Sequence, residues 1–301
     1  MDHKTFEEYL DTLRVKPGKA ISLAKDFHTD YDHKTMTKEE GELLLKEGIE
    51  NLADMQDRLY AENRHSILIV LQAMDAAGKD SAIKHVMTGL NPQGVTVTSF
   101  KTPSKQELAH DYLWRHYVAL PARGQIGIFN RSHYENVLVT RVHPEYVLAE
   151  NIPGIEKTDD MTPEFWAKRM KQINRFEKNI VQNGTMVLKF FLYVSKKEQK
   201  KRFLERIDDP TKNWKFSSAD IAEREKWDAY MKAYEDLLGN TSKEQAPWFV
   251  LPADDKWFTR LCMAAIITKE FRKLNCNYPV LSADEKNKLA AVRARLLEQK
   301  D

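Results

Sequence analysis

The chain contains 301 residues, and its 47 lysines and arginines against 45 aspartates and glutamates give a formal net charge of +2. A charged fraction of 31% beside a hydrophobic fraction of 42% is typical of a globular protein with a hydrated surface. The near-neutral balance excludes a surface built throughout to hold nucleic acid or an acidic membrane.

The first 62 residues are predicted to form an N-terminal arm and a helix that packs on the core. Residues 1–36 are polar and interrupted by Pro17 and Gly18, which favours an irregular arm. Residues 37–40, Thr-Lys-Glu-Glu, form a capping-box pattern that opens a helix. Apolar residues then recur at steps of three and four, as on the buried face of a helix: Leu45, Ile49, Leu52, Met55 and Leu59.

Residues 65–275 alternate between strand and helix patterns. Strands are predicted at 65–71, 94–100, 126–129, 185–194 and 248–251, and the clearest helix at 162–181. This alternation predicts an α/β fold with a mostly parallel, five-stranded sheet flanked by helices. We divide the chain into the arm and helix (1–62), one domain (63–280) and a C-terminal helix (281–301).

A candidate phosphate-binding loop follows the first strand, at residues 72–81. Gly78 and Lys79 match the pattern GxxxxGK[ST], but Ala73 replaces its first glycine and Asp80 replaces its serine or threonine. The small residues 76–78 would let backbone N–H groups surround a phosphate at the N-terminus of the next helix, and Lys79 would reach the phosphates. An ordinary strand-to-helix turn is the alternative interpretation.

Asp75 is an unusual residue in such a loop, because a carboxylate repels phosphate unless a cation accompanies it. Its oxygens suit Mg²⁺, which would bridge carboxylate and phosphate. Asp75 could instead accept a proton from an attacking nucleotide oxygen, or simply cap the turn.

Two further segments carry candidate site residues. The third strand ends at Asn130, and the next residue, Arg131, could clamp an acceptor phosphate. His133 and Tyr134 are more often packing residues than catalysts. Residues 196–206 hold six basic and two acidic side chains, and a helical lid is predicted over 196–226 that would close over the phosphates and exclude water.

Together these segments resemble the polyphosphate kinase 2 family over roughly residues 20–280. The similarity rests on Met-Asp-Ala-Ala-Gly-Lys-Asp (74–80), Gly-Leu-Asn-Pro (89–92), Asn-Arg-Ser-His-Tyr (130–134), Arg-Ile-Asp-Asp-Pro (206–210) with Lys212, Trp214 and Lys215, Ala-Pro-Trp (246–248) and Asp-Asp-Lys (254–256). The resemblance implies a phosphate-loop kinase fold related to thymidylate kinase, a helical lid, Mg²⁺ (with Mn²⁺ as a substitute), and reversible transfer of the terminal phosphoryl group of inorganic polyphosphate to a nucleotide.

The resemblance also implies roles for individual residues. The implied catalytic residues are Asp75, Lys79 and Arg131. The metal would be bound by Asp75 and Asn130. The acceptor nucleotide would contact Asn130, Arg131, Tyr134 and Glu135. The polyphosphate chain would contact Ala76, Ala77, Gly78, Lys79, Asp80, Ser81, Arg202 and Arg206. Many family members carry Asp in place of Asn130, and the Asn form resembles the subgroup that accepts both nucleoside mono- and diphosphates. The departure leaves Asp75 as the only obvious carboxylate for the metal.

Two other functions are consistent with the same residues. One is an ATP-dependent nucleoside monophosphate kinase, which would need an adenine-binding face for its donor. The other is a non-enzymatic polyanion-binding module that uses the basic 196–226 region. We expect no nucleic-acid or membrane partner, because neither a uniformly basic surface nor an apolar run long enough to span a bilayer is present. A reducing cytoplasm is favoured by the two cysteines, Cys262 and Cys276, which have no CxxC spacing or zinc-type Cys/His cluster and are expected to be buried or idle. We also expect a homo-oligomer, a dimer or a tetramer.

Overall fold

The computed structural model describes residues 3–32 and 36–299 of the chain. Its strands, all parallel, are β1 (Ser66–Ala73), β2 (Val95–Ser99), β3 (Ile126–Asn130), β4 (Thr185–Tyr193) and β5 (Trp248–Pro252). Within the described residues they form one sheet in the order β2-β3-β1-β4-β5. The predicted α/β fold and the five predicted strands are therefore confirmed, with ends that differ by one or two residues.

Helices fill the segments between these strands. The α-helices are α1 (His3–Thr12), α2 (Leu23–Asp26), α3 (Lys38–Glu62), α4 (Lys79–Val86), α5 (Lys105–Leu108), α6 (Trp114–Val118), α7 (Val139–Val142), α8 (Glu145–Leu148), α9 (Pro163–Gln182), α10 (Lys196–Asp208), α11 (Ala219–Glu225), α12 (Trp227–Thr241), α13 (Lys256–Phe271) and α14 (Ala283–Glu298). Short 3₁₀ helices are η1 (Pro92–Gly94), η2 (His133–Val137), η3 (Thr158–Asp160), η4 (Asn213–Lys215) and η5 (Arg272–Leu274).

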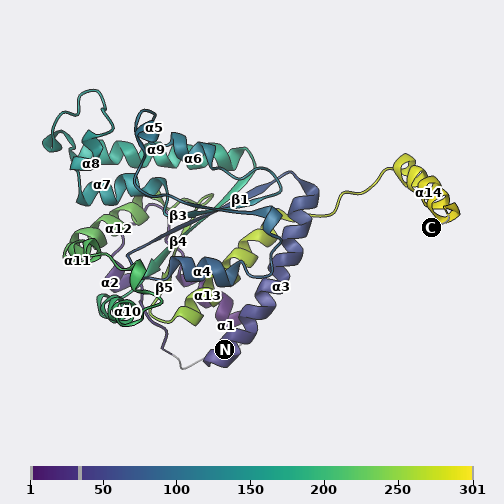
Figure 1. Ribbon diagram of the computed structural model, residues 1–301, viewed down its shortest axis with the longest axis horizontal. Coiled ribbons are helices and arrows are strands. Elements are labelled where there is room, and N and C mark those ends of the chain that lie inside the picture. The colour runs from purple at the N-terminus through teal and green to yellow at the C-terminus, as the bar shows by residue number, and fades with distance from the viewer. Residues whose placement is uncertain (1–2, 33–35, 300–301) are drawn as a thin grey trace.

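The sheet lies between two helical layers. On one face α13 packs against α3, α4 and α1, and on the other α9 packs against β4, α12 and η2 (Figure 1). The apolar residues of β1, from Ile67 to Leu71, are fully buried, as a strand covered on both faces requires. β1 lies at the centre of the sheet, so the loop that follows it opens where neighbouring connections diverge to opposite sides.

The N-terminal segment is more ordered than the sequence pattern predicts. The expectation of an irregular arm over residues 1–36 is wrong in part, because α1 packs its apolar residues Phe6 and Leu10 against α13. Residues 13–15 then pair antiparallel with β5, where Val15 N donates to Trp248 O at 2.9 Å. This pairing covers the edge of β5 and protects it from non-native association. Residues 1–2 and 33–35 of the predicted arm lie outside the described part.

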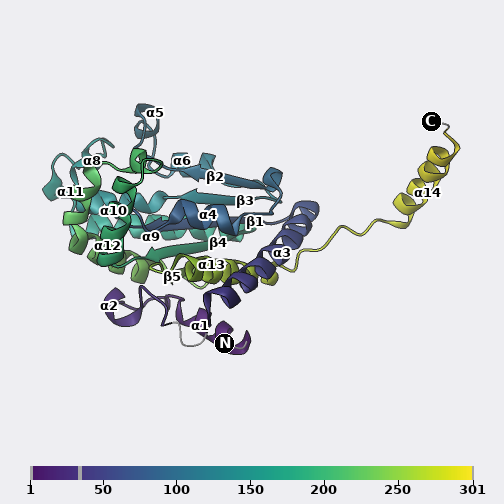
Figure 2. The same ribbon diagram turned by 60° about the horizontal axis from the view of Figure 1, so that its bottom comes forward.

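The predicted capping box at Thr37 is confirmed. Glu40 N donates to the Thr37 hydroxyl at 3.2 Å, and Thr37 N donates to the Glu40 carboxylate at 2.8 Å. The helix that follows, α3, buries Leu52 and Leu59 fully. At the other end of the chain every residue of α14 is exposed, and the helix stands away from the body on an extended segment (Figures 1 and 2). Residues 300–301 lie outside the described part.

Candidate functional site

A cavity of about 1120 Å³ opens at the carboxyl ends of β1, β2 and β3, beneath α10 and η4. It brings together most of the residues that the sequence predicted: Asp75, Ala76, Gly78, Lys79, Asp80, Ser81, Asn130, Arg131, Arg202 and Arg206. The predicted residues Ala77, Tyr134 and Glu135 do not line it.

The loop at residues 74–78 takes a conformation that suits phosphate binding. Ala76 and Gly78 have positive φ values of 61° and 108°, and α4 begins at the next residue, so its N-terminus faces the cavity. Ala73 stands at the first glycine of the pattern GxxxxGK[ST]. It is still part of strand β1, where the extended backbone does not require glycine. Burial lowers the pKa of Lys79, and the neighbouring Arg131 lowers it further. The Lys79 ammonium donates to Ala73 O at 3.0 Å, which holds it beside the loop.

Arg202 supports this loop from behind. Its guanidinium is 4% exposed and donates to Ala76 O at 3.1 Å, Ala77 O at 2.8 Å, Ala253 O at 2.7 Å and Asp254 O at 2.9 Å. The remaining N–H donates to Glu198 at 2.9 Å. All five N–H donors of Arg202 are therefore engaged within the protein. Arg206, one turn along α10, is the half-exposed arginine of the pair.

Asp75 and Arg131 meet across the cavity floor. An Arg131 N–H donates to Asp75 Oδ1 at 3.0 Å, and the Glu135 carboxylate lies 3.9 Å from the same guanidinium. Arg131 has a positive φ of 62°, which is uncommon for a residue with a side chain. Its backbone N–H donates to Leu71 O at 3.1 Å. Burial raises the pKa of Glu135, although Arg131 and Lys79 oppose the shift.

Asn130 contacts a second carboxylate. Its amide donates to Asp80 Oδ1 at 2.8 Å, although Asp80 stands where the sequence pattern has a serine or threonine. The carboxylates of Asp75 and Asp80 therefore line the cavity together with Asn130, and Glu205 lines it as well. Hard oxygen donors of this kind fit a divalent cation such as Mg²⁺. The sequence expectation that Asp75 is the only carboxylate at hand is thus corrected by the Asp80–Asn130 contact.

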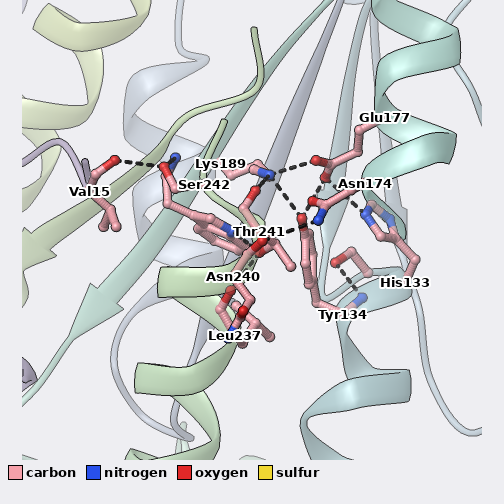
Figure 3. Close-up of polar contacts among 12 residues, drawn as sticks. Val15, His133, Tyr134, Asn174, Glu177, Lys189, Leu237, Asn240, Thr241 and Ser242 are labelled. Carbon is pink, nitrogen blue, oxygen red and sulfur yellow. Dashed lines mark hydrogen bonds and ion pairs between the residues drawn. The ribbon is translucent and has the colours of Figure 1, made fainter. Parts of the chain in front are cut away.

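Tyr134 and His133 belong to a buried polar network, which Figure 3 shows between η2, α9 and β4. The Tyr134 hydroxyl donates to Glu177 at 2.7 Å, and His133 Nε2 lies 3.2 Å from the same carboxylate. Lys189 donates to Glu177 at 2.6 Å, to the Tyr134 hydroxyl at 2.9 Å and to Thr241 O at 2.8 Å. Tyr134 is fully buried, so the predicted contact between this side chain and the acceptor nucleotide is wrong. The network instead fixes the segment that carries Arg131.

The structure adds lining residues that sequence reasoning missed. Lys101 and Thr102 follow the carboxyl end of β2, and Lys256 lies at the start of α13, where burial lowers its pKa. The rule that ligands bind beyond the carboxyl ends of parallel strands could have indicated the first two. Lys212, Lys215 and the 74%-exposed Trp214, which belong to the predicted lid segment, line the cavity as well. Among the residues described, eight basic and three acidic side chains line the cavity.

Comparisons with known proteins agree with this geometry. Residues 35–278 match the model of the family described as Polyphosphate kinase 2. The chain is 48% identical over 286 residues to the ADP-polyphosphate phosphotransferase of Rhodopseudomonas palustris, covering 95% of this chain and 98% of the relative. It is 45% identical to the AMP/ADP-polyphosphate phosphotransferase of Meiothermus ruber, over 76% of this chain and 80% of the relative.

A solved structure is similar over nearly the whole chain. The crystal structure of polyphosphate kinase 2 from Arthrobacter aurescens superimposes with a TM-score of 0.85 at 38% identity, covering 96% of each chain. In the described part of the chain, no helix has the length and apolar character needed to cross a membrane. The family match, the relatives and the fold lead to one conclusion: the chain belongs to the polyphosphate kinase 2 family.

Proposed function

We propose that the protein is a polyphosphate:nucleotide phosphotransferase, which transfers the terminal phosphoryl group of inorganic polyphosphate to nucleoside mono- and diphosphates. The family match and the names of the relatives support polyphosphate-driven nucleotide phosphorylation. The observation that carries the proposal is the cavity itself: it concentrates eight basic side chains among those described, in a chain whose net charge is only +2. A polyanion is the ligand such a site favours.

The residues divide into a donor side and an acceptor side. The loop N–H groups and Lys79 would hold the end of the polyphosphate, and Arg206 would contact phosphates farther along the polyphosphate. Arg131 would place the acceptor phosphate in line. The bond between the terminal phosphorus and its bridging oxygen breaks, the acceptor phosphate oxygen forms the new bond, and shortened polyphosphate leaves. The chain's contribution is positioning and charge neutralisation, the main needs of phosphoryl transfer.

Phosphotransferases of this family generally depend on a divalent metal, and we propose Mg²⁺, with Mn²⁺ as a substitute. Asp75, Asp80 and Asn130 would hold it, and when bound it supplies positive charge to phosphate oxygens. With the metal bound, Asp75 would be one of its ligands, and Arg131 would hold the acceptor phosphate in place of this carboxylate.

One incubation separates this function from its alternatives. Polyphosphate, ADP and Mg²⁺ should yield ATP, and the yield should vanish when polyphosphate is left out. An ATP-dependent monophosphate kinase would form ATP from two ADP molecules with or without polyphosphate, and a non-enzymatic module would form none. Lys79→Ala should lose about two to three orders of magnitude in turnover, as when a charge-stabilising donor is removed. Lys84→Ala, exposed on the same helix, is the matched control and should stay near wild type.

The acceptor range is the finer part of the proposal. The relatives are named for ADP, for AMP and ADP, and for AMP. We propose that this chain uses both mono- and diphosphates, of adenosine and of guanosine. Product analysis with AMP, ADP, GMP and GDP, each with polyphosphate as sole donor, tests this. Phosphorylation of ADP and GDP but not of AMP and GMP would refute the proposed use of monophosphates.

We also propose a homo-oligomer, a dimer or a tetramer. The supporting observation is α14, whose apolar residues Leu289, Val292 and Leu296 are exposed on a helix that stands off the body (Figure 2). Light scattering of the full chain and of a chain ending at residue 280 tests both the state and the part α14 plays in it. A monomeric full chain would refute the proposal.

A further inference from the structure

A second group of chemically reactive side chains lies at the opposite end of the sheet from the cavity. Glu62 is the last residue of α3, His65 immediately precedes β1, and Cys276 follows η5. One ligand atom from each of the three lies within 4.8 Å of the other two. His65 Nδ1 and Glu62 Oε2 are 3.3 Å apart.

The fold brings these residues together through two helix ends. Helices α3 and α13 pack along their lengths. Asn63 (φ 52°) caps the end of α3, and α13 continues into η5, which ends at Asn275 (φ 49°), so both helical segments end in an asparagine with left-handed backbone. Each asparagine turns the chain sharply after its helix, which places the following side chains side by side. The His65 backbone is itself fixed, since its carbonyl accepts from Gly124 N at 2.7 Å.

The chemistry of the three groups differs from that of the cavity. A thiol and an imidazole are softer ligands than carboxylates and prefer Zn²⁺ to Mg²⁺. In a tetrahedral zinc site the ligand atoms lie roughly 3.3–3.6 Å apart, because Zn–S is about 2.3 Å and Zn–N and Zn–O about 2.0–2.2 Å. The spacing in this cluster, at most 4.8 Å, therefore needs a contraction of about 1.5 Å at most, within the reach of side-chain rotation.

We propose that Glu62, His65 and Cys276 form a Zn²⁺ site with a water molecule as fourth ligand. The thiolate and the carboxylate neutralise the ion. Cys276 is 9% exposed, while the side chains of His65 and Glu62 are 35% and 18% exposed, so the ion can enter from solvent. The site would tie the end of α3 to the segment that leads to α14.

This site is separate from the proposed reaction metal. It lies before β1, whereas Asp75 and Asp80 follow it, and an eight-residue strand spans about 26 Å. None of the three zinc ligands lines the cavity. Zinc at this position is therefore a structural ion, and phosphoryl transfer with Mg²⁺ should not depend on it.

The test uses the full chain, stripped with a chelator and then equilibrated with Zn²⁺. We expect one zinc per chain by elemental analysis, and a rise in Tm of about 4 °C at a free Zn²⁺ concentration of 100 times Kd. Co²⁺ in place of Zn²⁺ should give a thiolate-to-cobalt charge-transfer band, which reports the sulfur ligand directly.

Variants locate the site. Cys276→Ser and His65→Gln should each weaken zinc binding by at least about 100-fold, more than the loss of an outer partner does. Cys262→Ala, which removes the thiol buried within α13, is the control and should bind zinc as wild type does. His65→Gln changes a partly exposed ring, so it keeps the test valid if Cys276→Ser fails to fold. Zinc retention that is unchanged in His65→Gln, or a cobalt complex without the thiolate band, would overturn the proposal.

Discussion

Lys189→Met would remove the only ammonium group of the buried network in Figure 3 while preserving much of the side-chain volume. Lys189 lies in β4, and both it and Glu177 have side chains at most 1% exposed. Burial alone would raise the pKa of Glu177, but Lys189 and His133 outweigh it and hold this pKa below its ordinary value. Glu177 is therefore ionised, and the variant would leave its charge buried without a cation.

The expected loss is large because the charge cannot reach water. Removing one partner of a buried ion pair costs about 3–5 kcal/mol in free energy of unfolding. The control is Lys273→Met, which breaks an ion pair of the same 2.6 Å length whose lysine side chain is 55% exposed. There we expect less than about 1 kcal/mol, since solvent screens an exposed pair.

Urea denaturation followed by tryptophan fluorescence measures both losses. Adding Glu177→Gln to Lys189→Met removes the stranded charge and keeps acceptors for Tyr134 and His133. We expect the double variant to be more stable than the sum of the two single losses implies, by at least about 1 kcal/mol. A Lys189→Met loss no larger than that of Lys273→Met, or strictly additive losses in the double variant, would refute the reasoning.

Three further outcomes follow from the site and the core. Asn130→Asp would set a second carboxylate beside Asp80, and the added negative charge should bind a divalent cation more tightly, so half-maximal activity should need less Mg²⁺ than in wild type; an unchanged Mg²⁺ titration would contradict the metal assignment. Arg206→Ala should raise the KM for polyphosphate with little loss of stability, whereas Arg202→Ala should lower stability, because four loop carbonyls lose their donor; denaturation and kinetics of both variants measure the two effects, and an equally large stability loss in Arg206→Ala would contradict the distinction. Burial holds the pKa of His116 well below its ordinary value, so only the unfolded chain gains this proton as pH falls below about 6.5, and stability should drop by up to about 1.4 kcal/mol per pH unit. His116→Asn should flatten that dependence between pH 7.5 and 5.5, and an unchanged slope would contradict it.

The architecture could be predicted from the sequence because its signals are local. The continuous apolar run in β1 and the alternation of strand and helix patterns indicate the parallel sheet without reference to distant residues. The Thr37 capping box and the small residues around Gly78 act within a few positions of the chain. These patterns were sufficient for the fold class and for the location of the loop.

The assignments that the structure changed depend on contacts between residues far apart in the chain. Arg202 looks like a free lid cation until its guanidinium meets the carbonyls of Ala76 and Ala77, more than a hundred residues away. The family resemblance implies a nucleotide contact for Tyr134, yet its hydroxyl is bonded to Glu177, which comes from α9.

The same reason explains what the sequence could not show at the far end of the sheet. Cys276 and His65 have no spacing that suggests a metal, and only the packing of α13 on α3 places them together. Local patterns therefore determined where the strands, the loop and the basic helix α10 lie in this chain. Tertiary structure decided which charged groups face the cavity and which are held inside, because burial and pairing depend on side chains supplied by other elements.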